Sequence, residues 1–188
     1  RGQLDGSLGR GQWVSKDWDI ATDARPEQVQ RLFRRVLPTG IEHGTVTVML
    51  GREGFEVTTL RAETTYSDGR RPDHIDFVAS IEEDLARRDF TVNAIAVEPD
   101  SGKLIDPFDG VSDLERRRLR AVGDPARRFA EDGLRVLRAA RFVASLGFEL
   151  DPDTARAITP SLATYRKVSP ERVRDEWTKA LLAPAPSR

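Results

Sequence analysis

Runs of strand-forming residues mark the first half of the chain. Thr45–Leu50 and Phe55–Leu60 favour β-structure, and the segment Gly51–Gly54 between them predicts a hairpin. Asp19–Ala21 has the pattern of the end of a strand, and Ala94–Val97 that of a further one. The first half therefore predicts a sheet with short helices between its strands.

Two helices are expected among these strands. Pro26 suits a first helical position and opens a helix over Glu27–Leu37, whose shared apolar face comprises Val29, Leu32, Phe33 and Val36. Ile81–Arg87 predicts a second, short helix. The segment Tyr66–His74 is polar and contains Gly and Pro, and it predicts a loop.

The pattern changes to helix after Pro107–Gly110. Ala130–Leu146 predicts the longest helix, which Gly147 ends, with an apolar stripe of Leu134, Leu137, Phe142, Val143 and Leu146. Further helices are predicted over Asp153–Ile158 and Pro170–Leu182. Strands followed by helices indicate an α+β fold, in which a head with a sheet leads into an all-helical neck. We place the boundary between residues 1–110 and residues 111–188.

Composition narrows the class of protein. The 188 residues are 38% hydrophobic and 32% charged, enough for one full core or for two small units that share one. No apolar run approaches the ~20 residues that span a bilayer, and the N-terminus lacks the pattern of a signal peptide. Zero cysteines exclude disulfides, thiolate zinc sites and a cysteine nucleophile, which suits a cytoplasmic protein.

The net charge of −1 hides a segregation of charge along the chain. Arginines concentrate between Arg116 and Arg141, whereas acidic residues concentrate earlier, around Asp17–Asp23 and at Glu82–Asp84. A separate cationic segment suggests a bound polyanion. A solvated helix face is the alternative, and charge alone favours it.

Two acidic residues that alternate along a strand suggest a metal site. Alternate strand residues point to one face, so Asp17 and Asp19 are expected side by side, with Trp18 facing away. Neighbouring carboxylates suit a hard divalent cation such as Mg²⁺. Glu56 interrupts a β-rich run, and on a neighbouring strand it would supply a third carboxylate, although a solvent-facing strand residue is the simpler interpretation.

The joint between the short helix and the strand after it carries several polar side chains. The guanidinium of Arg88 offers fixed donors that could clamp a triphosphate. Asp89 could orient Arg88 or cap the turn. Asn93 could equally cap the turn or contact a ligand.

The predicted long helix places four charged residues on one ridge, because helical neighbours lie three and four positions apart. They are Asp132, Arg135, Arg138 and Arg141. An Asp can accept a hydrogen bond from an exocyclic amino group, and an Arg can donate one to a ring nitrogen. Cytosine and adenine present that pair of groups, so such a ridge could select C and A without a template. A salt-bridged surface helix would have the same pattern.

Six segments follow one another in a distinctive order: Asp17–Ala24, His43–Val48, Tyr66–Pro72, Arg87–Ala94, Asp106–Gly110 and Glu131–Arg135. In this order they resemble the bacterial class II tRNA nucleotidyltransferases, or CCA-adding enzymes, and the related poly(A) polymerases. These families belong to the DNA polymerase beta-like superfamily. The resemblance covers nearly the whole chain from Asp17 to about Leu182 and implies a polymerase beta-like nucleotidyltransferase head.

The resemblance implies template-independent addition of C and A to the 3′ end of tRNA, with CTP and ATP as donors. Two Mg²⁺ ions would be bound by Asp17 and Asp19, with Glu56 as the third catalytic carboxylate. Arg88 would contact the incoming nucleotide, whose pocket would be lined by Asp132, Arg135, Arg138 and Arg141. The loop over residues 66–72 would lie near the flexible segment that helps to switch from C to A addition.

The start of the chain departs from the family pattern. In Arg1–Arg10 only Asp5 and Leu8–Arg10 match, and Leu4 stands where the family has a phosphate-facing arginine. Triphosphate binding at this segment is therefore in question. The chain also ends within the neck, and we expect it to be a piece of a longer enzyme.

Three alternatives compete with CCA addition. Bacterial poly(A) polymerases typically carry a Gly-Arg-Arg-Phe segment where this chain has Ile41–Thr47, which disfavours that activity. Specialised CC-adding or A-adding enzymes differ at few residues and remain open. A non-catalytic RNA-binding relative is disfavoured by the intact Asp17 and Asp19 but favoured by the altered start of the chain.

Overall fold

The computed structural model describes residues 18–63 and 75–186. Asp17, the segment Arg1–Arg10 and the predicted loop Tyr66–His74 lie outside these residues. The described chain forms two compact units. The first unit takes in the described residues up to Arg61 together with Phe77–Ile81, and the second unit takes in the other described residues.

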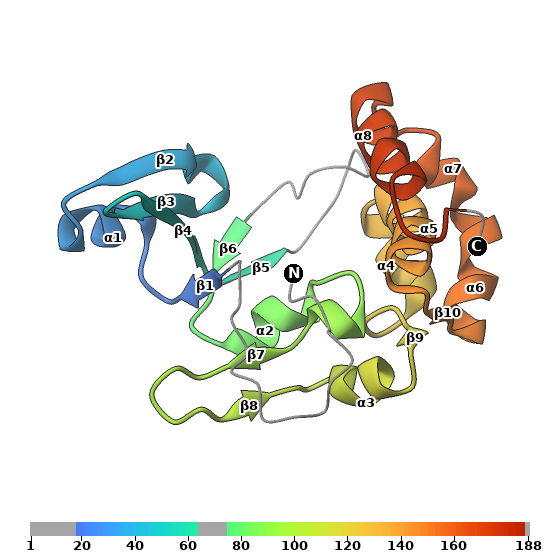
Figure 1. Ribbon diagram of the computed structural model, residues 1–188, viewed down its shortest axis with the longest axis horizontal. Coiled ribbons are helices and arrows are strands. Elements are labelled where there is room, and N and C mark those ends of the chain that lie inside the picture. The colour runs from blue at the N-terminus through green and yellow to red at the C-terminus, as the bar shows by residue number, and fades with distance from the viewer. Residues whose placement is uncertain (1–17, 64–74, 187–188) are drawn as a thin grey trace. The chain divides into compact units, whose positions relative to one another are not determined.

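A mixed four-stranded sheet makes up most of the first unit (Figure 1). Its elements are β1 (Asp19–Thr22), α1 (Pro26–Leu32), β2 (Val36–Gly40), the short 3₁₀ helix η1 (Ile41–His43), β3 (Thr45–Leu50) and β4 (Glu53–Thr59). The strand order is β1-β4-β3-β2, in which β1 is parallel to β4 and the other pairs are antiparallel. β5 (Arg61–Glu63) and β6 (Ile75–Phe77) lie where the chain passes between the units.

The hairpin between β3 and β4 is confirmed. Its turn consists of Gly51 and Arg52, and Leu50 pairs with Glu53 across it. Gly51 has a φ of 64°, in the left-handed region that glycine adopts without a steric cost. Tight two-residue turns of this kind fix the register of the strands that they join.

The predicted helix Glu27–Leu37 is too long. α1 ends at Leu32, and Val36 begins β2, where it pairs with Val48 of β3. Val36 packs against the buried cluster of Val29, Val46, Val48 and Val57. The β-branched side chain of Val36 is thus placed in the core by the sheet, whereas Leu32, on the last turn of α1, remains 75% exposed.

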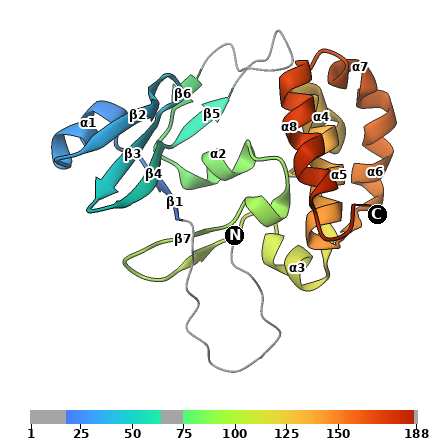
Figure 2. The same cartoon turned by 45° about the horizontal axis from the view of Figure 1, so that its top comes forward.

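The second unit is mainly helical (Figure 2). Its first part contains α2 (Ile81–Ala86), η2 (Thr91–Asn93), β7 (Ala96–Val97), β8 (Leu104–Ile105), α3 (Gly110–Glu115) and β9 (Arg118–Leu119). Its second part contains α4 (Pro125–Glu131), α5 (Leu134–Leu146), β10 (Glu149–Leu150), α6 (Pro152–Ile158), η3 (Thr159–Ser161), α7 (Leu162–Tyr165) and α8 (Pro170–Leu181).

These elements confirm the predicted α+β class. α2, α6 and α8 match the predicted short helices to within a residue or two. The proposed boundary at residue 110 lies inside the second unit, and the functional division there stays a prediction. No helix in the part of the chain that the structure describes is long and apolar enough to cross a membrane.

The predicted long helix over Ala130–Leu146 is wrong in one respect, because it breaks at Asp132–Gly133. Asp132 has extended backbone angles, φ −143° and ψ 109°, and separates α4 from α5. A Cβ on Gly133 would lie 2.5 Å from the carbonyl carbon of Thr164, so α7 packs too closely for a side chain here. Gly147 ends α5 as predicted, with a φ of 66°.

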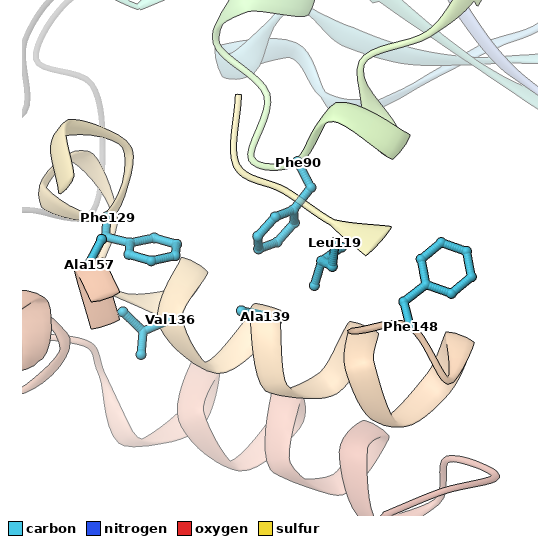
Figure 3. Close-up of a cluster of buried hydrophobic side chains, with 7 residues drawn as sticks. All are labelled: Phe90, Leu119, Phe129, Val136, Ala139, Phe148 and Ala157. Carbon is cyan, nitrogen blue, oxygen red and sulfur yellow. The ribbon is translucent and has the colours of Figure 1, made fainter. Parts of the chain in front are cut away.

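One hydrophobic cluster joins the two parts of the second unit (Figure 3). It consists of the buried side chains Phe90, Leu119, Phe129, Val136, Ala139, Phe148 and Ala157. Phe90 also meets Phe142 of α5 edge-to-face, with ring centroids 5.6 Å apart. The turn that carries Arg88 and Asp89 is therefore anchored directly on α5.

Candidate functional site

Asp19 and Glu56 lie opposite each other on neighbouring strands. β1 and β4 are parallel, and Asp19 is in register with Glu56. Both side chains are exposed, whereas Ile20 and Val57, the next pair in register, belong to the other face of the sheet. The prediction that a neighbouring strand brings Glu56 beside Asp19 is confirmed.

The strand residues next to these carboxylates on the same face include several threonines. Thr47 of β3 is the partner of Glu56 on the other side, and the hydroxyls of Thr45 and Thr58 share a hydrogen bond of 3.0 Å two pairs further along. The opposite face carries the valine cluster and α1. The sheet therefore separates a packed apolar face from a face on which charged groups meet solvent.

Carboxylate oxygens are the ligands that hard divalent cations prefer, so Asp19 and Glu56 fit part of a magnesium site. Within residues 18–63 and 75–186, no group of three or more acidic or histidine side chains could hold a metal ion. The third expected ligand, Asp17, lies outside the described residues. The described part of the chain thus supplies two of the three predicted carboxylates, in register.

Arg88 is oriented by Asp84, and not by Asp89 as the sequence suggested. Its Nη2 lies 3.4 Å from the buried carboxylate of Asp84, and its Nη1 donates to the carbonyl of Asn93 at 3.2 Å. Its Nε is buried and has no hydrogen-bond partner among the residues that the structure describes. The guanidinium is held by Asp84 and the Asn93 carbonyl while 33% of the side chain stays exposed, an arrangement suited to binding an anion.

Asp89 caps the turn, which was the second interpretation of its role. Its Oδ1 accepts from the backbone N–H of Phe90 at 2.9 Å and from the Asn93 amide at 3.0 Å, and its Oδ2 accepts from Arg138 Nε at 2.6 Å. Burial raises the pKa of Asp89, but the charge of Arg138 and the hydrogen bonds from Asn93 and Arg138 outweigh burial and lower the pKa overall.

The three arginines of α5 each have an acidic partner. Arg135 pairs with Glu131 at 2.7 Å and also donates to the carbonyls of Arg87 and Arg128, at 3.1 and 3.0 Å. Arg138 pairs with Asp89, and Arg141 pairs with the buried Glu176 of α8. Arg135 is 8% exposed and Arg141 4% exposed. The solvated helix face is therefore the wrong interpretation for these two.

Asp132 does not share the helical ridge of these arginines, because it precedes α5. Its Oδ1 accepts from the backbone N–H of Leu134 at 2.9 Å. Both of its oxygens accept from Arg172, at 3.3 and 2.7 Å. Asp132 and Arg135 nevertheless remain neighbours at the start of α5, where the backbone N–H of Arg135 donates to the Asp132 carbonyl at 3.0 Å.

Sequence reasoning missed the acidic and basic partners that hold this cluster. Arg172 and Glu176 lie on α8, some 40 and 35 residues from their partners, and no local spacing links such pairs. Asp113 was missed as well. Fully buried, it accepts from Thr91 Oγ1 at 2.7 Å and pairs with Arg118 and Arg120, which fixes the turn after Asp89.

A family described as "Poly A polymerase head domain" matches residues 5–120, more than half of the chain. A second family, "Probable RNA and SrmB- binding site of polymerase A", matches residues 147–188. The two matches follow each other in the order that the sequence motifs predicted. The predicted resemblance is confirmed.

Known proteins agree with this assignment. A CCA-adding enzyme of Lactobacillus johnsonii is 50% identical over 168 residues, 89% of this chain and 42% of the relative. The crystal structure of Bacillus stearothermophilus CCA-adding enzyme in complex with CTP is 44% identical, with a TM-score of 0.82, and the match covers 89% of this chain and 40% of that one.

A further solved structure, a tRNA nucleotidyltransferase complexed with a primer tRNA and an incoming ATP analog, is 34% identical with a TM-score of 0.67. That match covers 85% of this chain and 45% of the other. The chain spans about two-fifths of the length of the curated relatives that it matches. The predicted polymerase beta-like fold is confirmed by these likenesses.

Proposed function

The chain belongs to the poly A polymerase head domain family, and from this premise we propose that it adds C and A to the 3′ end of tRNA. The observation that carries the proposal is the in-register pair Asp19 and Glu56 on an open, polar sheet face. The similarity to a CCA-adding enzyme bound to CTP, and to a tRNA nucleotidyltransferase bound to primer tRNA and an ATP analog, supports the choice of substrates.

CCA-adding nucleotidyltransferases are generally metal-dependent. In our proposal Asp17 and Asp19 hold two Mg²⁺ ions and Glu56 is the third carboxylate. Carboxylate oxygens are ligands that Mg²⁺ prefers, and the exposed side chains of Asp19 and Glu56 leave room for the ions. When bound, the ions supply positive charge to the attacking and leaving oxygens. The protein's own part is to fix carboxylates in register on two hydrogen-bonded strands, so that no side chain must reorganise during the reaction.

The nucleotide is held by the second unit in this proposal. Arg88, whose side chain is 33% exposed, contacts its triphosphate. Asp132 accepts from the base amino group and Arg135 donates to the ring nitrogen. Arg138 and Arg141, both tied to acidic side chains, hold the pocket in shape. Residues 1–110 would thus carry catalysis and residues 111–188 base selection.

A single incubation tests the activity. The intact protein would be mixed with Mg²⁺, CTP, ATP and a tRNA that lacks its terminal CCA, and the products would be sequenced. Addition of CCA supports the proposal. Addition of C alone, of a single A to a tRNA that already ends in CC, or of a long run of A would identify a specialised enzyme or a poly(A) polymerase, and no addition would contradict the proposal.

A further inference from the structure

Arg172 holds the carboxylate of Asp132 from a different helix. Its two terminal nitrogens face the two carboxylate oxygens, at 3.3 and 2.7 Å, which is a bidentate arrangement. The side chains of Asp132 and Arg172 are 16% and 27% exposed. The pair is therefore largely shielded from solvent but open at one side.

The helix that carries Arg172 is itself fixed on α5. Next to Arg172, Val173 packs against the buried cluster of Leu134, Leu137 and Val168. One turn further along α8, Glu176 pairs with Arg141 in the interior. Figure 2 shows α8 running alongside α5. The guanidinium of Arg172 thus has a rigid base from which to orient its partner.

The hydrogen bonds from the described residues leave Asp132 one free acceptor position. An ionised carboxylate has about four lone-pair positions, two on each oxygen. Oδ1 uses both, for the Leu134 N–H and for Arg172 Nη1, whereas Oδ2 uses one, for Arg172 Nη2. A single position on Oδ2 remains, in a direction that Arg172 sets.

We propose that Arg172 is a positioning residue for base selection. This inference rests on the function proposed above. Arg172 fills two of the carboxylate's acceptor positions and the Leu134 N–H fills a third. Asp132 is thereby left with a single acceptor position for the amino group of cytosine or adenine. Without Arg172 the Leu134 N–H still holds Oδ1, but Oδ2 loses its bond to Arg172, and the amino group loses a pre-oriented partner. Uracil and guanine present no amino group there, so they gain nothing from this orientation.

The test compares single-nucleotide addition of CTP, ATP, UTP and GTP by the intact protein and its Arg172→Ala variant. We expect kcat/KM for CTP and ATP to fall by about ten- to a hundredfold, the loss typical of a charge-assisted hydrogen bond. Values for UTP and GTP should stay unchanged, so that discrimination falls by the same factor. Arg172→Lys keeps the charge but loses the forked guanidinium, so its kcat/KM values for CTP and ATP should lie between those of the original protein and those of Arg172→Ala.

Arg174→Ala is the matched control. Arg174 lies on the same helix, is 73% exposed and, within residues 18–63 and 75–186, pairs only with its neighbour Asp175, so all four rates should be unaffected. An equal loss for all four nucleotides in Arg172→Ala, or no loss, would overturn the inference and leave a purely structural pair. If Arg172→Ala does not fold, the same comparison is made with Arg172→Lys, for which unchanged discrimination overturns the inference. Failure of the unaltered protein to add C or A would instead remove the proposed function.

Discussion

The two charged regions of this protein satisfy their charges in opposite ways. On the sheet of the first unit, Asp19 and Glu56 are exposed, and no ion pair joins either of them to a described residue. In the second unit, Asp89, Asp113 and Glu176 are buried and each is paired with arginine. Charges of the first kind are available to a ligand, whereas charges of the second kind are committed to the protein.

This difference in burial and pairing decides whether a substitution should lower activity or stability. Removing an exposed carboxylate costs little stability, because water solvates the folded and unfolded states alike. Removing one partner of a buried pair leaves an uncompensated charge in the interior. A substitution in the first region should therefore lower activity more than stability, and one in the second region stability more than activity. Four experiments test this contrast.

The largest effect is expected for Asp19→Asn. Nucleotide addition should fall by about 10²–10³-fold or more, because the site loses a charge positioned for phosphoryl transfer. Thermal unfolding should be unchanged. Glu53→Gln, at the hairpin end of the strand that carries Glu56, is an exposed control that should keep full activity. Near-normal activity of Asp19→Asn would remove this carboxylate from the catalytic site.

A smaller effect, on stability, is expected for Asp89→Asn. Asn can still accept from the Phe90 N–H, but it lacks the charge that Arg138 binds at 2.6 Å. The loss of this charge-assisted bond should lower the free energy of unfolding by about 1.5–3 kcal/mol. Urea titration measures it, and Asp175→Asn, at an exposed pair, should change nothing. A variant as stable as the original would mean that the pair is not part of the core.

The pH dependence of stability tests Asp113. Burial raises the pKa of its carboxyl, but hydrogen bonds from Thr91, Arg118 and Arg120 lower it overall below the ordinary value of 3.8. A lowered folded-state pKa means that Asp113 contributes stability above pH 3.8, which is lost as the pH falls through the folded-state value. Asp113→Asn should therefore be less stable at pH 7, and its difference from the original protein should shrink at pH 3. A difference that is the same at both pH values would contradict the expectation.

How far the sequence predicts this molecule depends on how local each feature is. The hairpin at Gly51 and the end of α5 at Gly147 follow from short-range patterns, and both are confirmed. The register of Glu56 with Asp19 instead depends on the pairing of β1 with β4, which the sequence offered as one of two interpretations. The end of α1 and the break at Asp132 were missed, because Val36 is drawn into the sheet and Gly133 meets the backbone of α7. Such contacts join residues that are distant in sequence.

The same limit applies to the candidate site. The order of the motifs predicts which residues form the site, but the partners of these residues decide their environment. Asp132 and Arg135 were expected on one helical ridge, and instead each is held by its own ion pair, with Arg172 and with Glu131. Only the packing of α8 against α5 brings Arg172 to Asp132, and no periodicity in the sequence encodes it.

The smallest effect on stability is expected at Arg127, and its neighbour Arg128 allows an exposed and a shielded arginine to be compared at adjacent positions. Arg127 is 79% exposed and its Nε lies 3.6 Å from Glu131, so Arg127→Ala should change the free energy of unfolding by less than about 0.5 kcal/mol. Arg128 is 11% exposed and contacts the other oxygen of Glu131 at 2.7 Å.

Arg128→Ala should cost more than Arg127→Ala, because it removes a shielded donor from the carboxylate that also holds Arg135. Both variants lose one positive charge from the same turn of α4, so long-range electrostatics affects them almost equally. Urea titration of the two variants in parallel therefore isolates burial from charge. Equal losses of unfolding free energy would show that the arginine-rich segment acts through its overall charge. The contrast between exposed charges and buried, paired charges would then be wrong for this segment.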